Sequence, residues 1–155
     1  MESESLVRVV RMYEGRGVAE PITGDTALSA RHWLESAADD LDGVAVLVEQ
    51  ERWRLAYKAG YDVLRNAAEA IVTRAGYRIR GGDGSHEAVF ALAHALVGDK
   101  SDVFNGANMA QARQRRHASQ YIDVDRELGV DQTEARLVVH WATEAISVAR
   151  RWLDQ

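Results

Sequence analysis

The chain has 155 residues, 46% of them hydrophobic, a length and composition that fit one compact domain with a buried core. It contains no cysteine, which excludes disulfide bonds, thiolate metal sites and a cysteine nucleophile. The formal net charge of -5 argues against a general basic coat for duplex DNA, although three of the nineteen basic residues lie within Arg113 to Arg116.

Residues 1–24 are predicted to be an N-terminal extension and linker, and residues 25–155 to be a helical bundle domain. A short apolar cluster between Leu6 and Met12 is followed by glycines and by the only proline, Pro21. The first residues lack the basic region of a secretory signal, and no apolar run approaches the roughly 20 residues of a membrane span. We therefore expect a cytoplasmic protein with no membrane association.

Apolar residues at three-and-four spacing predict five long helices. They cover residues 25–49, 53–75, 86–97, 102–121 and 131–153. Asp25 and Asp131 are predicted N-caps, Ser85 caps the third helix, and Ser101 or Asp102 caps the fourth. Because no segment shows a convincing period of two, the predicted fold class is all-α, an antiparallel four- to five-helix bundle.

Two features of the predicted helices concern their packing. The four tryptophans, Trp33, Trp53, Trp141 and Trp152, each fall on the apolar stripe of their helix, which predicts that they lie in the core. Gly60 lies inside the second long helix, where glycine costs about 1 kcal/mol of helix propensity. It therefore indicates a close helix crossing at that point.

The fourth predicted helix changes character along one line of residues. On 3.6 residues per turn this line runs through Val103, Ala107, Ala110, Gln114, His117 and Tyr121. An apolar stripe that turns polar is typical of a surface covered by a partner chain or a ligand. The alternative is that the arginines beside it form a solvated helix end next to a connecting loop.

Other candidate motifs do not carry a site. The glycines of residues 81–84 lack the preceding strand and the lysine of a phosphate-binding P-loop. The five histidines include no pair at i, i+4 and no Glu-x-x-His, so no metal or cofactor is predicted. No nucleophile elbow of the Gly-x-Ser-x-Gly type occurs either.

The stretch from Arg113 to Tyr121 carries a family resemblance. Two long helices, a glycine-rich loop, a helix ending in arginines and a capped final helix together resemble the HEPN family of prokaryotic helical domains, over roughly residues 28–153. The informative family motif is an arginine, then Asn, Asp or His, then typically three residues and a histidine. Arg116 and His117 match its first two positions, but Tyr121 stands where the histidine belongs. Arg113 and His117 form an alternative pair with shorter spacing.

The resemblance implies a chemistry for these residues. Active HEPN proteins are metal-independent endoribonucleases in which the ribose 2′-OH attacks the adjacent phosphate, and two copies of the motif meet across a dimer. On the family alignment Arg116 binds phosphate, His117 orients it or shares proton transfer, and Tyr121 bonds or stacks on a base. On the alternative pairing Arg113 and His117 do the chemistry. Tyrosine is a poor base at neutral pH, because its unperturbed pKa is about 10.

Two functions follow as expectations. The first is an RNA-associated HEPN-like protein of a toxin-antitoxin or phage-defence system, whose endoribonuclease activity the tyrosine weakens. The second is a non-catalytic helical module that binds a protein partner, such as a nucleotidyltransferase or a cognate antitoxin. In both cases the resemblance implies a homodimer.

Overall fold

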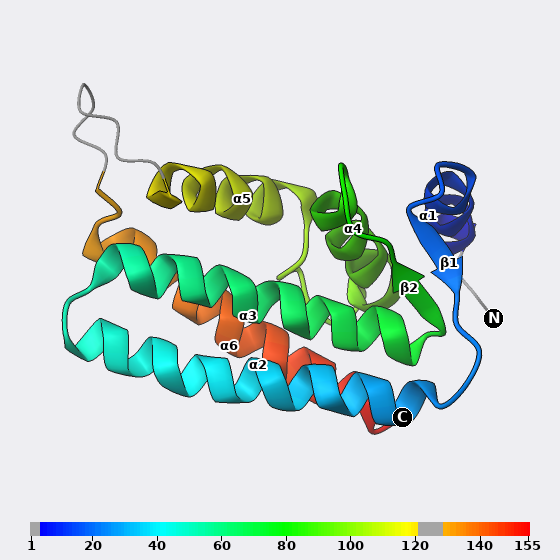
Figure 1. Cartoon of the computed structure of the whole chain (residues 1–155), viewed down its shortest axis with the longest axis horizontal. Helices are drawn as coiled ribbons and strands as arrows, with labels where there is room; N and C mark the ends of the chain where they lie inside the picture. Colours follow the sequence, from blue (N-terminus) through cyan, green and yellow to red (C-terminus); the bar gives the residue numbers. More distant parts are fainter. Residues whose placement is uncertain (1–3, 121–128) are drawn as a thin grey trace.

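The computed structural model describes residues 4–120 and 129–155, and Figure 1 shows their arrangement. Within these residues the structure contains six helices and one small two-stranded sheet. The elements are α1 (Glu4–Gly15), β1 (Ala19–Pro21), α2 (Thr26–Glu49), α3 (Trp53–Arg74), β2 (Tyr77–Ile79), α4 (Ser85–Val97), α5 (Gly106–Gln120) and α6 (Gln132–Leu153). Helices account for 74% of the structure, which confirms the all-α class in broad terms.

The core is built on three long helices that contact one another, α2, α3 and α6. α3 packs on both α2 and α6, and it also contacts α4 and α5 on its other side (Figure 1). Its residues are buried nearly all the way round, including Tyr61, Leu64 and Ile71, because neighbours surround it. α3 is therefore the element against which every candidate site in α4 and α5 is positioned.

The predicted close crossing at Gly60 is confirmed. A Cβ atom on Gly60 would lie 3.0 Å from Val138 Cγ1 of α6, and Val138 is fully buried. The missing side chain lets α3 and α6 approach, which offsets the cost of glycine in a helix.

Gly60→Val is expected to lower the free energy of unfolding by about 1–3 kcal/mol, because the new side chain overpacks against Val138. Chemical denaturation monitored by circular dichroism measures the change. Gly43→Val on α2 is the matched control, since nothing lies within 4 Å of its Cβ position. Equal stability changes in the two variants would contradict the close packing at Gly60.

Two predicted caps are confirmed and two are wrong. The Asp25 carboxylate accepts a hydrogen bond from Leu28 N at 3.0 Å, and Asp131 accepts one from Glu134 N at 2.8 Å. Ser85 is already inside α4 and buried, and Gly84 with a φ of +82° takes the cap position. α5 begins after Asn105, whose side chain accepts from Asn108 N at 2.8 Å, rather than after Ser101 or Asp102.

The N-terminal region contains more structure than its sequence predicted. α1 buries Leu6, Val10 and Tyr13 and packs on α4. β1 pairs antiparallel with β2, with Glu20 opposite Arg78. Strands of three residues are too short to show a recognisable alternation, which explains why the sequence predicted none. The boundary at residue 24 remains a prediction.

Two expectations about buried stripes are wrong. Trp33 is 39% exposed, because the face of α2 that turns to the core is centred on Ala30, Ala37 and Val44, with Leu34 and Leu41 only partly buried beside it. In the segment 101–120, Ala107 and Ala110 are exposed, as are Gln114 and His117. Met109 and Ala112 are buried instead.

Candidate functional site

The three arginines of α5 project in two directions. Successive helical residues are turned by about 100°, so Arg113 and Arg116, three residues apart, share one face of the helix, while Arg115 points away from it. Arg113 is exposed, while Arg115 and Arg116 are half-buried. The arginine-rich stretch therefore divides into Arg115, which is paired with Glu134, and the two arginines that act on Tyr61 and His86.

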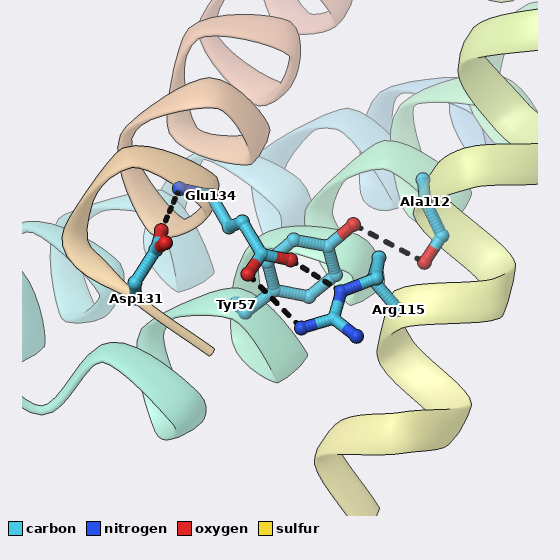
Figure 2. Close-up of polar contacts among 5 residues, drawn as sticks. All are labelled: Tyr57, Ala112, Arg115, Asp131 and Glu134. Atoms are coloured by element: carbon cyan, nitrogen blue, oxygen red, sulfur yellow. Dashed lines mark hydrogen bonds and ion pairs between the residues drawn. The ribbon is translucent and has the colours of Figure 1, made fainter. Parts of the chain in front are cut away.

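Arg115 joins α5 to α6 (Figure 2). Its Nε and Nη2 both donate to the carboxylate of Glu134, the second bond at 3.0 Å. Hydrogen bonding to Glu134 raises the pKa of Arg115, and the Tyr57 hydroxyl beside this pair donates to Ala112 O at 3.4 Å. A bidentate, partly buried pair of this kind fixes geometry, so Arg115 ties α5 to the first turn of α6.

Arg116 lies over α3. Its guanidinium carbon is 5.0 Å from the centre of the Tyr61 ring, within the range of a cation–π contact. Its Nη2 lies 3.6 Å from the carboxylate of Asp62. Arg116 thus keeps 24% of its side chain exposed, with its position set by two neighbouring residues of α3.

His86 at the start of α4 joins the same cluster. Its Nε2 lies 2.8 Å from Arg65 Nη1, and its Nδ1 lies 2.7 Å from the Tyr61 hydroxyl. A guanidinium can only donate, so Nε2 must accept. The neutral ring therefore carries its hydrogen on Nδ1 and donates it to Tyr61 Oη.

Burial and positive charge keep His86 neutral. Desolvation, followed by the charges of Arg65, Arg116 and Arg113, lowers the pKa of His86 to about 4. Burial likewise raises the pKa of Tyr61 to about 12, although the same arginines oppose that change. At neutral pH the centre of the cluster is an uncharged Tyr–His pair surrounded by cations.

The lowered pKa of His86 predicts a loss of stability in acid. The unfolded chain binds a proton near pH 6.5, while folded His86 binds one only near pH 4, so stability falls as the pH drops through this window. We expect His86→Gln to show a shallower loss of unfolding free energy between pH 7 and pH 4. Denaturant unfolding at each pH measures it, with the exposed His32→Gln as control. If the unfolding free energies of wild type and His86→Gln fell in parallel with pH, the lowered pKa of His86 would be contradicted.

The sequence-predicted residues are only partly brought together. Arg113 and Arg116 lie on the same side of the molecule, and both act on Tyr61 and His86 through their charges. His117 is exposed. Tyr121 lies outside the described residues.

Sequence reasoning missed the residues that organise this cluster. Tyr61, Arg65 and Glu69 recur every four residues on α3, and Glu69 is only 7% exposed. Burial raises the pKa of Glu69, while the charge of Arg65, 4.0 Å away, opposes the rise. Polar residues at i, i+4 inside a helix buried on all sides are a recognisable signal for a buried polar network.

The cluster is suited to holding an anion rather than a metal. The charges of three guanidinium groups, from Arg65, Arg113 and Arg116, act on a neutral imidazole, and of these Arg116 is also paired with Asp62 and Arg65 with Glu69. Within residues 4–120 and 129–155, no three His, Asp or Glu side chains come together as metal ligands would. No helix among these residues is long and apolar enough to cross a bilayer.

No protein-family model, curated protein or solved structure matches the chain.

Proposed function

We propose that the chain is a HEPN-like, RNA-associated protein that binds the phosphate backbone through Arg116 and Arg113 of α5. The observation that supports this is the position of Arg116, held over the Tyr61 ring at 5.0 Å with 24% of its side chain exposed. A pre-positioned guanidinium loses less side-chain freedom on binding phosphate than a freely moving one. Its toxin-antitoxin or phage-defence setting comes from the resemblance alone.

The proposal treats cleavage as secondary to binding. Transfer of the 2′-OH to phosphate needs a cation for the phosphorane and a group that moves protons. Arg116 and Arg113 supply cations, and exposed His117 is the histidine closest in sequence to them. Because Tyr121 stands in the motif's histidine position, we propose that the chain is a degenerate metal-independent endoribonuclease. In this proposal it retains RNA binding but has lost strong cleavage.

A second candidate is a non-catalytic module that binds a protein partner such as a nucleotidyltransferase, or a second copy of itself. It is favoured by three large apolar side chains exposed on α2: Leu28, Trp33 and Val46. Exposed tryptophan is enriched at protein interfaces. The two candidates differ in whether RNA binding depends on α5.

Arg116→Gln and Arg113→Gln are each expected to weaken binding of a mixed RNA pool uniformly across sequences. Each should also reduce the slope of log affinity against log salt by roughly one. Fluorescence anisotropy over a salt series measures both effects. Arg31→Gln is the charge-matched control, because Arg31 lies on α2, on the opposite side of α3 from α5 in Figure 1.

Cleavage is tested in the same samples. Any cleavage should persist in EDTA and leave a 2′,3′-cyclic phosphate, His117→Ala should reduce cleavage more than binding, and Tyr121→His should increase cleavage. If neither wild type nor Tyr121→His binds or cuts the pool, the RNA proposal is wrong and the partner-binding module is favoured.

A further inference from the structure

A groove of about 1150 Å³ runs between α1, α4 and α5. α1 and α5 lie on either side of α4 in Figure 1, and each contributes one wall. Its apolar lining includes Leu6, Val9, Phe90, Leu96, Met109 and Trp152. The volume slightly exceeds the usual range of small-molecule sites, roughly 300–1,000 Å³. The buried face of α5 packs on α3. The exposed residues Gly106 and Ala110 of α5 border the groove.

Few charged groups line this groove, and they lie at its two ends. Arg113 and Glu87 line one end, and Glu87 accepts a hydrogen bond from the Tyr13 hydroxyl at 3.4 Å. Arg113 makes no ion pair with any part of the chain that the structure describes. Asp99 lines the other end, just past the C-terminus of α4. An anion is therefore repelled at the Asp99 end, while at the other end Arg113 attracts it and Glu87 opposes that attraction.

His94 adds a polar group inside the groove. It lines the wall between the two ends, and its Nδ1 is buried with no hydrogen-bond partner among the described residues. An apolar site with a guanidinium at one end and one imidazole along its wall has the composition of a small-molecule site, in which few polar groups set orientation.

We propose that this groove binds a free long-chain carboxylic acid, with the carboxylate on Arg113 and the alkyl chain running past His94 toward Trp152. Arg113 matches the carboxylate because a guanidinium presents paired donors to its two oxygens. The chain gains from covering the apolar walls. Glu87 opposes the head group, so its neutralisation strengthens binding. The inference shares Arg113 with the proposed RNA site, but the groove walls below Arg113 take no part in that site, so Ala110→Phe tests the groove without changing an RNA-binding residue.

Isothermal titration of the full chain with dodecanoate, below its micelle concentration, tests the proposal. Dodecanoate is expected to bind at least about tenfold more tightly than octanoate, because four more methylenes are buried. Dodecan-1-ol, which has the same chain without a charge, should bind more weakly. Equal binding of the alcohol and the acid would overturn the assignment of a carboxylate, and so would failure of wild type to bind dodecanoate at millimolar concentration.

Variants locate the ligand. Arg113→Gln should weaken dodecanoate binding about tenfold and leave dodecan-1-ol unaffected, and Glu87→Gln should strengthen dodecanoate binding. Ala110→Phe should block the groove, while Ala107→Phe, on an exposed position of the same helix outside the groove, should not. Circular dichroism confirms that each variant is folded. Lys100 lies over the Trp152 ring at 5.8 Å, so a loss of binding in Lys100→Gln instead of Arg113→Gln would overturn the proposed orientation.

Discussion

Trp141→Ala is expected to lower the free energy of unfolding by about 3–5 kcal/mol, the range found for removal of a large aromatic side chain from a core. Trp141 is only 9% exposed and lies on α6 in the main hydrophobic core. The helices around it cannot close the space completely, so lost burial and a residual cavity both contribute. Urea denaturation followed by circular dichroism measures the change.

Trp33→Ala is the matched control for this prediction. The same substitution on α2 removes a side chain that is 39% exposed, so we expect a change of less than about 1 kcal/mol. Similar losses in the two variants would show that α6 is not packed as described, or that Trp33 is covered in solution. The second outcome would favour the partner-binding or homodimer function, because an exposed tryptophan would then be buried by another chain.

Local chemistry explains why parts of the fold could be predicted from the sequence. Asp25 and Asp131 cap their helices because a carboxylate three residues before a free backbone N–H satisfies it without help from the rest of the fold. Gly60 could be interpreted because an internal glycine is costly and needs a packing reason. Both signals lie within one or two helical turns.

The error in α5 has a physical cause. Among residues 106–117, the part of α5 whose burial the structure describes, only Met109 and Ala112 are buried, so the apolar pattern is too sparse to fix which face turns inward. Val103 and Phe104 are buried, but they belong to the turn before the helix. Counting Val103 as part of the helix rotated the predicted stripe away from Arg116. The tertiary fold, not the periodicity, decides that Arg116 faces α3.

The Tyr61–His86 cluster could not be found by spacing along the chain. Its two central residues are 25 positions apart, and their contact depends on how α4 returns across α3. Arg116 joins them from a third helix. The sequence identified Arg116 and His117 as candidates, but gave no sign that Tyr61 holds Arg116 in place.

Tyr61 is the residue whose replacement should disturb this cluster most. It is fully buried, it stacks with His86 at a ring distance of 5.7 Å, and its edge meets Phe90 at 5.8 Å. We therefore expect Tyr61→Ala to cost about 3–5 kcal/mol of unfolding free energy. Because Arg116 then loses the ring beneath it, RNA binding under the proposed function should also weaken in the protein that remains folded.

Tyr61→Phe separates the ring from the hydroxyl. It keeps the cation–π surface for Arg116 but leaves the Nδ1–H of His86 without its acceptor at 2.7 Å, so we expect a loss of about 1–2 kcal/mol and near-normal RNA binding. Tyr57→Phe is the matched control, because the Tyr57 hydroxyl donates over a longer 3.4 Å and should contribute less. Denaturant unfolding and RNA anisotropy measure the two effects separately. A Tyr61→Phe variant that binds RNA as poorly as Tyr61→Ala would show that the hydroxyl, and not the ring beneath Arg116, supports binding.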